Sequence, residues 1–374
     1  MSRPLAYEPR YALNAICPYF TMFPLEYPMR ALSRFKREAP VVMDPFCGRG
    51  TTLFAARALG LKTRGLDTSP VAVAVARAKL ARSSTEDVLD LARRLLAEVE
   101  PEAVPDSEFF RHCYDPLVLR AICQLREGLL TFDTDTDATV LLRAATLGCL
   151  HGPRSVHVEN QSYFSSQMPR TFSSKPDYSV RYWKKHHSRP PKVDVLKVLE
   201  RKLTRINADQ LANAGLFRNV RLADSRLASS LPEASRDFSV VVTSPPYYGM
   251  KTYVEDQWLR NWFLGATATV EYGNERQLQH TGQDVFADSL GSVWRNMART
   301  KSESLRMFVR FGIIPSASVD AKSLMLASLE ASKVGWKLIS VRHADTAAAG
   351  RRQARQMAAG SAAATEHDFH LIRV

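Results

Sequence analysis

Several features of membrane-bound and secreted proteins are missing from this sequence of 374 residues. It contains no run of about 18 apolar residues, which excludes a transmembrane helix. Its first segment, MSRPLAYEPRYALNA, has neither the apolar core nor the cleavage pattern of a secretion signal. The five cysteines are scattered and no CxxC pair occurs, which argues against a disulfide framework and against a sulfur-based zinc site. We therefore expect a cytoplasmic protein with no membrane partner.

Acidic residues are few compared with basic ones, and this is the first positive indication of function. The chain has 51 Lys and Arg against 38 Asp and Glu, a formal net charge of +13, and its apolar fraction of 45% is enough for a real core. A basic surface favours a polyanionic partner, most often nucleic acid. Charge alone leaves open an ordinary basic protein without such a partner.

Strand and helix patterns alternate in two separate parts of the chain, which predicts a parallel α/β sheet with right-handed crossovers. Helical patterns cover 51–60 and 69–81, and seven segments look like strands: 41–46, 61–67, 219–225, 237–247, 305–313, 336–344 and 369–374. Between the two parts, the helical stretches lie near 86–99, 114–130 and 137–150. The sequence thus predicts one α/β core with a long insertion. The Ala-rich segment 345–366 is expected to form a loop or a short helix between the last two strands.

A glycine-rich turn follows the first strand, in VVMDPFCGRGTT at 41–52. Gly48 and Gly50 allow a sharp turn and the close approach of a ligand, and the next helix begins with N–H groups that can bind a carboxylate or phosphate. Asp67 ends the second strand, where an acid can accept both hydroxyls of a ribose. Leu53 stands where a dinucleotide fingerprint has its third glycine, so a nicotinamide cofactor is disfavoured.

Four segments together resemble the amino-group DNA methyltransferase family. DPFCGRGTT (44–52) is similar to its S-adenosylmethionine loop, DPFxGxGTT, and TSPPYYG (243–249) to its catalytic tetrapeptide, [DNS]PP[YFW]. YFTMFPLEYPMRAL (19–32) resembles the segment that covers the methionine end of the cofactor, and RLADSRL (221–227) the strand whose acid reads the adenine. The resemblance implies an α/β, class I methyltransferase (Rossmann-like) mixed sheet. It also implies a catalytic domain at 1–82 and 217–374 and an insertion at 83–216.

Carried over position by position, the resemblance implies the residues that bind S-adenosylmethionine. Asp67 would hold the ribose hydroxyls, and Asp224, with Ser225 beside it, would accept a hydrogen bond from the adenine amino group. The other positions would line or cover the methionine and sulfonium end: Phe23, Pro24, Asp44, Phe46, Gly48, Gly50 and Thr51. No metal is expected, because the adjacent His186 and His187 have no evident acid partner and neighbouring side chains rarely converge.

The SPPY segment follows an apolar strand and is the predicted catalytic site. Pro245 and Pro246 fix the backbone, so that Ser244 and the Pro245 carbonyl can accept hydrogen bonds from an exocyclic amino group. Such bonds favour a pyramidal nitrogen that can attack the sulfonium methyl, and Tyr247 offers a stacking face to a base turned out of the duplex. In the family, Ser at the first position goes mostly with N4 of cytosine and Asp mostly with N6 of adenine. No Pro-Cys dipeptide occurs, which disfavours methylation at cytosine C5.

The insertion is the predicted DNA-binding region. Residues 151–205 hold 12 Lys and Arg but 4 Asp and Glu, and aromatic residues are interleaved with them, as suits phosphate contact and base stacking. The residues expected to contact DNA are Arg181, Lys184, Lys185 and Arg189. One departure from the family pattern is that the adenine-reading strand follows the insertion. In a predicted helix at 254–265, Trp258 and Trp262 are expected in the core and Arg260 near a phosphate.

The leading hypothesis is a DNA methyltransferase that makes N4-methylcytosine in double-stranded DNA, with a cognate restriction endonuclease or other defence protein as a candidate partner. Alternatives are an N6-adenine DNA methyltransferase and an RNA methyltransferase acting on guanine N2, which also combines DPFCG-like and PPY motifs. The 18 residues before Tyr19 leave no room for the N-terminal RNA-binding module usual in such RNA enzymes. A non-enzymatic alternative is a nucleic-acid-binding subunit on an inactive methyltransferase fold. The intact Gly48, Gly50, Asp67, Ser244 and Tyr247 argue against it.

Overall fold

The chain forms two compact units. The computed structural model describes residues 8–17, 24–152, 160–165, 176–206, 216–249, 257–270, 278, 281–313, 319–344 and 365–374. Unit 1 comprises Met1–Tyr19, Arg77–Arg218 and Tyr253–Gly273, and unit 2 comprises Phe20–Ala76, Asn219–Thr252 and Asn274–Val374.

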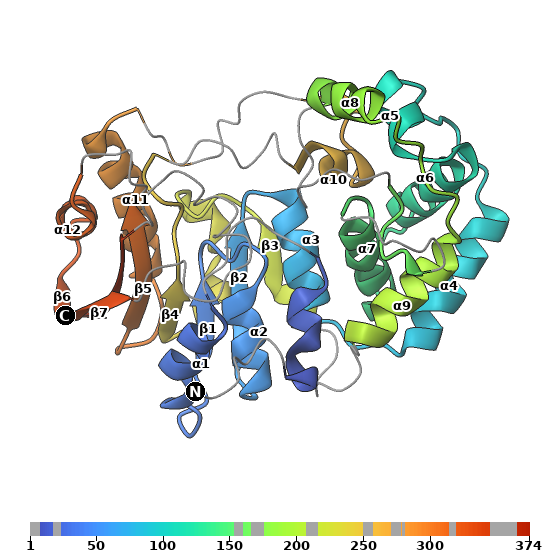
Figure 1. Ribbon diagram of the computed structural model, residues 1–374. Coiled ribbons are helices and arrows are strands. Elements are labelled where there is room, and N and C mark those ends of the chain that lie inside the picture. Colours follow the sequence, from blue (N-terminus) through green and yellow to red (C-terminus); the bar gives the residue numbers. More distant parts are fainter. Residues whose placement is uncertain are drawn as a thin grey trace. The chain divides into compact units, whose positions relative to one another are not determined.

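Unit 2 is built on a sheet that has seven strands within the described residues, in the order β3-β2-β1-β4-β5-β7-β6 (Figure 1). The strands are β1 (Val41–Asp44), β2 (Lys62–Asp67), β3 (Val220–Leu222), β4 (Val240–Thr243), β5 (Arg306–Ile313), β6 (Trp336–Ala344) and β7 (Thr365–Arg373). The first five strands pair in parallel, and β7 runs antiparallel between β5 and β6. This is the predicted class I methyltransferase (Rossmann-like) mixed sheet, and the fold prediction is confirmed.

Helices cover both faces of this sheet because its strands are apolar on both sides. Met307 and Val309 of β5 lie in one core cluster with residues of α11 (Gln283–Met297) and α12 (Ala321–Ala331). Phe308, which points the other way, meets Phe35 beyond α1 (Glu26–Ser33), with ring centroids 5.9 Å apart. The helix α2 (Thr51–Ala58), which begins directly after Gly50, contacts α1, β1 and β2. The next helix, α3 (Pro70–Ala78), crosses from unit 2 into unit 1.

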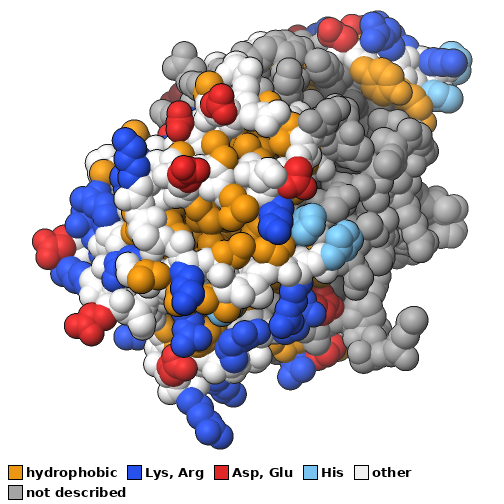
Figure 2. Space-filling model, turned by 90° about the vertical axis from the view of Figure 1, so that its left-hand side faces the viewer, with side chains coloured by type: hydrophobic (Ala, Val, Ile, Leu, Met, Phe, Trp, Pro, Cys, Tyr) orange, Lys and Arg blue, Asp and Glu red, His pale blue; other side chains and the backbone are white. Residues whose placement is uncertain are grey.

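Hydrophobic side chains also gather on the face of unit 2 that carries α12 and β6, among Lys and Arg side chains (Figure 2). Leu326 of α12 and Ile339 of β6 are 39% and 46% exposed. Since β6 is the last strand of the sheet, this apolar surface lies at an edge where a further strand or another chain would find unpaired backbone groups.

Unit 1 is helical over its described residues. Its helices are the 3-10 helix η2 (Pro9–Ala15) and α4 (Thr85–Glu98), α5 (Glu108–Cys113), α6 (Pro116–Leu130), α7 (Asp137–Cys149), α8 (Pro176–Lys185), α9 (Val195–Ile206) and α10 (Trp258–Phe263). The short 3-10 helix η4 (Leu216–Asn219) lies where the chain passes from unit 1 to unit 2, and η5 (Ala228–Ser230) and η6 (Glu233–Ser235) belong to unit 2. The helices predicted near 86–99, 114–130 and 137–150 correspond to α4, α6 and α7.

Local sequence signals explain where these helices begin. Ser84 accepts a hydrogen bond from Asp87 N, and Asp87 reaches back to the Ser84 backbone, so that α4 starts with a capping box. Asp115 caps α6 by accepting from Leu117 N, with a proline at the first helical position. By contrast, α9 was not predicted, although its buried residues recur at the helical spacing: Val195, Val198, Leu199, Leu203 and Ile206.

An aromatic cluster forms part of the core of unit 1. Trp258 and Trp262 of α10 are each 3% exposed, as predicted, and lie 4.7 Å from Phe109 and 4.8 Å from Phe110, respectively, between ring centroids. The prediction for Arg260 was wrong. Its guanidinium is buried and donates hydrogen bonds to Leu147 O and Gln257 Oε1, so it does not offer a surface contact to a phosphate.

The five cysteines are all buried and free, as the absence of a CxxC pair indicated. Burial raises the pKa of Cys123 and of Cys149 to about 11. Most of the Ala-rich segment expected as a loop, residues 345–364, lies outside the described residues, but Thr365 and Glu366 belong to β7 rather than to a loop. None of the described helices is both long and apolar enough to cross a membrane.

Candidate active site at the carboxyl edge of the sheet

Four parallel strands of unit 2 bring the predicted site residues to one edge of the sheet. Asp44 ends β1, Asp67 ends β2, Asp224 lies two residues beyond β3, and Ser244 directly follows β4. Ala223 N donates a hydrogen bond of 2.9 Å to Asp67 O, which holds the Asp224 segment beside the end of β2. The carboxyl edge of parallel strands is where open α/β sheets bind their ligands.

The glycine-rich loop has the conformation that its glycines allow. Gly48 and Gly50 have φ angles of +48° and +74°, in the left-handed region that other residues rarely adopt. A Cβ on Gly50 would lie 2.8 Å from Ala76 Cα, so this position also needs glycine for packing against α3. Gly48 N donates a hydrogen bond of 2.8 Å to Asp67 Oδ2, which ties the loop to the end of β2.

Asp44 lies at the centre of the edge and is 1% exposed. Its Oδ1 accepts hydrogen bonds from Thr243 Oγ1, at 2.6 Å, and from Phe46 N, at 3.1 Å. Its Oδ2 makes no hydrogen bond of ordinary geometry to the described residues, although the nearby Thr52 hydroxyl also favours the charged form of the carboxylate. Burial raises the pKa of Asp44 to about 7, because a charged carboxylate is poorly solvated there.

Asp67 is half-buried and is oriented by the backbone. One carboxylate oxygen accepts from Gly48 N and the other from Ser69 N, at 2.8 and 2.9 Å. Burial raises its pKa, although backbone hydrogen bonds from Ser69, Gly48 and Thr68 favour the charged form. Each oxygen retains a second lone pair for a ligand hydroxyl.

The segment with Asp224 and Ser225 is already engaged within the protein. The Asp224 carboxylate accepts from Arg226 Nε, at 3.0 Å to each oxygen, and from Arg226 NH2, at 2.6 Å. Ser225 is buried, and its carbonyl accepts a hydrogen bond from Asn296 Nδ2. An adenine amino group would therefore share the Asp224 carboxylate with Arg226.

The other residues assigned to the cofactor differ in exposure. Thr51 is buried at the start of α2, and the half-buried ring of Phe46 lies edge-on to Trp294, with centroids 6.4 Å apart. Pro24 is exposed, and Phe23 lies outside the described residues.

The SPPY segment packs against the end of β5 and the beginning of β7. Tyr247 donates a hydrogen bond of 2.5 Å to Glu366 Oε1, and its ring lies edge-on to Phe311, with centroids 6.3 Å apart. Ser244 and Pro246 are half-buried and Pro245 is buried. Glu366 was not predicted, because the sequence placed it in a loop and nothing local indicates that an acid there would be buried.

The four basic residues assigned to DNA lie in unit 1. Arg181, Lys184 and Lys185 are exposed on α8, whose Val180 and Trp183 are buried, and Arg189 is exposed just beyond it. Lys184 forms an ion pair with Glu108 of α5. The structure thus groups three of the four cations on one helix, but one of them already has an acidic partner.

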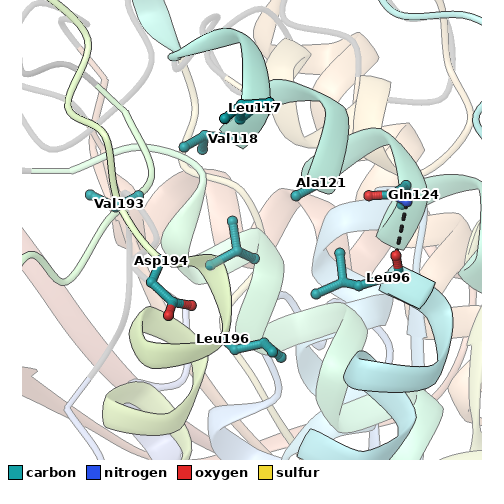
Figure 3. Close-up of a pocket in the computed structure, with 9 residues that line it drawn as sticks. Leu96, Leu117, Val118, Ala121, Gln124, Val193, Asp194 and Leu196 are labelled. Atoms are coloured by element: carbon teal, nitrogen blue, oxygen red, sulfur yellow. Dashed lines mark hydrogen bonds between the residues drawn. The ribbon is translucent and has the colours of Figure 1, made fainter.

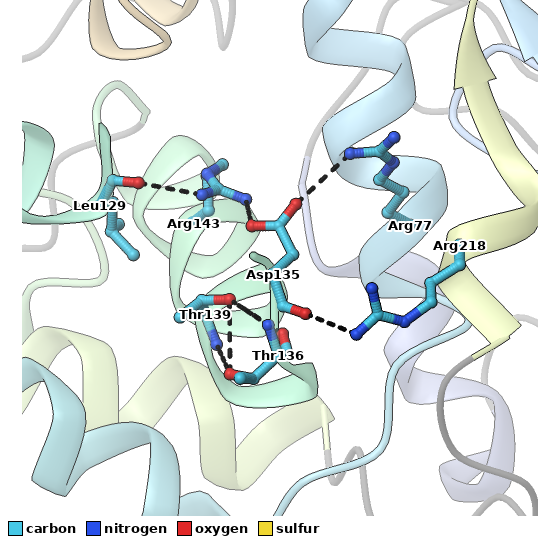
Figure 4. A network of polar contacts seen from close by, with 7 residues as sticks. All are labelled: Arg77, Leu129, Asp135, Thr136, Thr139, Arg143 and Arg218. Atoms are coloured by element: carbon cyan, nitrogen blue, oxygen red, sulfur yellow. Dashed lines mark hydrogen bonds and ion pairs between the residues drawn. The ribbon is translucent and has the colours of Figure 1, made fainter. Parts of the chain in front are cut away.

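Two other features of unit 1 include none of the predicted site residues. A pocket of about 250 Å³ between α4, α6 and α9 is mainly aliphatic, with Gln124 and Asp194 as polar members of its lining (Figure 3). The Asp135 carboxylate forms ion pairs with Arg77, at 3.4 Å, and Arg143, at 2.7 Å, while Arg218 donates to its carbonyl (Figure 4).

Within the described residues, no three His, Cys, Asp or Glu side chains gather as a metal site.

A family comparison agrees with the site in unit 2. The family model of N6/N4 methyltransferases, described as DNA methylase, matches residues 6–78, which include the glycine-rich loop and Asp67. The match supports the resemblance of this part of the chain to the amino-group DNA methyltransferase family. The DNA methylase family acts at the N6 or N4 position, and its match covers the first two strands of the sheet and the helices that follow them.

Comparisons with individual proteins add little to this. No curated protein matches the sequence. Two structures of the rRNA methyltransferase aviRa from Streptomyces viridochromogenes are 14% identical, cover 97% of this chain and 89% of that chain, and have TM-scores of 0.34 and 0.33. A structure described under the conversion of a disulfide bond into a thioacetal group during echinomycin biosynthesis is 10% identical, covers 92% and 80%, and has a TM-score of 0.33. At such scores the fold rests on the strand order of unit 2 itself.

Proposed function

We propose that this chain is a DNA methyltransferase that transfers a methyl group from S-adenosylmethionine to N4 of cytosine in double-stranded DNA. The observation that carries the proposal is the hydrogen bond between Thr243 and Asp44. It joins the residue before the SPPY segment to the first residue of the DPFCGRGTT loop, so that the two motifs meet at one edge of the sheet. A restriction endonuclease of the same sequence specificity is the partner we propose for such an activity.

The residues at this edge fit the proposed cofactor. The buried Asp44 Oδ2 makes no hydrogen bond of ordinary geometry to the described residues and suits a positively charged sulfonium. A Cβ at Gly48 would meet only Phe46 O, at 4.0 Å, so the loop leaves room for a ligand. Asp67, oriented by two backbone N–H groups, would hold the ribose hydroxyls, and Asp224 would hold the adenine amino group.

When bound, S-adenosylmethionine supplies an electrophilic methyl group on its sulfonium. Ser244 and the Pro245 carbonyl would accept hydrogen bonds from the target amino group and direct its lone pair. The stiffness of the two prolines keeps these acceptors in place, and Tyr247 would stack on the flipped base. Positioning of this kind needs no covalent intermediate between the protein and the base.

The choice of cytosine N4 rests on Ser244, because the family pairs Ser at this position mostly with cytosine. To test it, DNA incubated with isotope-labelled cofactor is hydrolysed and its nucleosides are separated by mass spectrometry. We expect label in N4-methylcytosine. N6-methyladenine alone would contradict the base assignment, label confined to RNA would favour an RNA methyltransferase, and no label in either would favour an inactive fold.

The variant Ser244→Ala should reduce turnover more than cofactor binding, since its hydroxyl acts on the nucleophile. Ser292→Ala is a matched control, because Ser292 is another half-buried serine of unit 2, and its hydroxyl donates to Asp288 O within α11. Equal turnover in the two variants would contradict the role of Ser244.

Cofactor binding is tested separately by calorimetry on chelator-treated protein. We expect binding without added metal, and Asp67→Ala should weaken it about tenfold or more, as for the loss of hydrogen bonds to a charged group. Asp237→Ala is the control, because Asp237 pairs with Arg64 on the surface of the same unit. Undiminished binding by the Asp67 variant would remove the ribose assignment.

A further inference from the structure

The side chain of Glu366 is buried at the catalytic edge of the sheet, where an acid is unexpected. It is 1% exposed and lies on β7 opposite Gly312, one pair from the end of β5. The SPPY segment reaches the same place, because Tyr248 forms a bridge with Ile313, the last residue of β5. Tyr247 O–H donates to Glu366 Oε1 at 2.5 Å.

A buried arginine lies beside the Glu366 carboxylate, within ion-pair distance but without a hydrogen bond to its Oε2. Arg310 NH1 lies 3.9 Å from Glu366 Oε2, and the rest of its guanidinium makes a bidentate pair with Asp368, at 2.7 and 2.8 Å. Arg310 also lies over the ring of Tyr27, 4.3 Å from its centroid. A guanidinium fixed in this way has one orientation, and it places a positive charge beside the Glu366 side chain.

We propose that Glu366 is a positioning residue that holds the Tyr247 ring in place for the target base. The inference rests on the proposed function, in which Tyr247 is the stacking face. A tyrosine ring can rotate about two side-chain bonds, and an edge contact such as that with Phe311 limits this rotation less than a hydrogen bond at the end of the ring. The hydrogen bond from the phenol to a fixed carboxylate anchors the far end of the ring, so the ring keeps its plane when no base is bound.

This arrangement predicts that Glu366 acts on turnover through Tyr247 alone. Glu366→Ala should lower kcat about tenfold, the effect of losing one buried hydrogen bond, with little change in the KM for the cofactor. Tyr247→Phe, which keeps the ring and removes the hydroxyl, should lower kcat by a similar factor. In the double variant the loss should be no larger than in either single variant, since both remove the same bond.

Rescue and stability controls separate positioning from folding. Glu366→Gln keeps an acceptor at the same place and should recover most of the lost kcat. Asp320→Ala removes the cap of α12, where Asp320 accepts from Ser323 N, so it destabilises unit 2 without touching Tyr247. It should leave kcat unchanged. A multiplied loss in the double variant, or no rescue by glutamine, would overturn the proposal.

A second measurement does not depend on DNA or on turnover. With 3-fluorotyrosine at position 247, the ¹⁹F spectrum of the free protein should show one narrow resonance in the wild type and in Glu366→Gln. Glu366→Ala should shift and broaden it, because the ring then samples several orientations. Identical spectra in all three would overturn the positioning role even if methylation is found. Distinct spectra without methylation of any nucleic acid would keep the anchor and refute the proposed function.

Discussion

Thr243 Oγ1 donates a hydrogen bond of 2.6 Å to Asp44 Oδ1, across 199 positions of sequence. Each residue ends a strand, and the two strands pair directly through Val42 with Val240 and Met43 with Val241. The bond therefore joins the C-terminal ends of β1 and β4. The glycine-rich loop follows the first of these strands, and the diproline segment follows the second.

Replacing the donor of this bond should destabilise the protein. Thr243→Val keeps the shape of the side chain but leaves a buried carboxylate short of a hydrogen bond, so we expect the free energy of unfolding to fall by about 1–3 kcal/mol. Thr63→Val is the matched control, because Thr63 is also a buried strand threonine and its hydroxyl has no partner among the described residues. It should be neutral or stabilising. Urea unfolding of both variants measures the difference, and equal losses would contradict the assigned bond.

Stability should depend on the ionisation of Asp44. Burial raises its pKa from 3.8 to about 7, so the folded protein holds a proton that the unfolded chain releases. The stability that this proton provides is full below about pH 4 and is lost as the pH rises towards 7. Asp44→Asn should reduce the fall in stability over this range, measured by urea unfolding at pH 5 and pH 8.

Asp320 is a control for this pH dependence, because its pKa is shifted in the opposite direction to that of Asp44. The pKa of Asp320 is lowered by the hydrogen bonds from the Ser323 backbone and side chain, so its contribution is lost only as the pH falls below the ordinary range of an acid. Asp320→Asn should leave the profile between pH 5 and pH 8 unchanged. An Asp44→Asn profile parallel to that of the wild type would show that Asp44 is already ionised at pH 5.

The two glycines at either end of α2 should respond differently to alanine. Gly50 and Gly60 have φ angles of +74° and +76°, so alanine at either costs about 1–2 kcal/mol for the left-handed backbone. At Gly60 a Cβ meets nothing within 4 Å, whereas at Gly50 it would lie 2.8 Å from Ala76 Cα. Gly50→Ala should therefore cost about 1–3 kcal/mol more than Gly60→Ala in thermal or urea unfolding. Similar losses of unfolding free energy in the two variants would mean that α3 moves away from the added Cβ at little cost.

The salt dependence of DNA binding should identify which cations of the insertion touch phosphate. Lys185→Ala should lower the slope of log affinity against log salt by about 0.9, the value for one phosphate contact. Glu108→Gln should strengthen binding, because it releases Lys184 from its ion pair. Glu98→Gln removes an equal charge from a different helix, α4, and should change little. A slope unchanged by Lys185→Ala would place the DNA elsewhere.

The fold could be predicted because its strands are local sequence features. Each strand lies within or overlaps a predicted segment, since a buried strand such as Val240–Thr243 is a short apolar run bounded by polar residues. Two elements, α9 and the start of β7, were not predicted, because their polar residues hide the spacing of their apolar ones. The basic residues of α9 obscured its apolar stripe, and the first two residues of β7, Thr365 and Glu366, were assigned to the Ala-rich segment 345–366.

The candidate site was predictable only where one segment carries it. The left-handed turn at Gly48 and Gly50 and the strand-end position of Asp67 follow from residues close together in sequence. The pair of Asp224 with Arg226 is also local, since the two residues lie two positions apart. The burial of Glu366 does not follow from nearby residues, because it depends on which side chains tertiary packing brings near. The buried position of Arg260 was missed for the same reason.

The burial of all five cysteines has a practical consequence. Thiolates, which are the species that maleimides and iodoacetamides attack, are scarce where burial has raised the pKa, as at Cys123 and Cys149. The folded chain should thus remain unmodified under brief alkylation, and one cysteine placed on the exposed face of α8, at Arg181 or Lys185, would be the sole reactive site. A dye or photocrosslinker attached there could map the path of a nucleic acid across unit 1 without first removing any native residue.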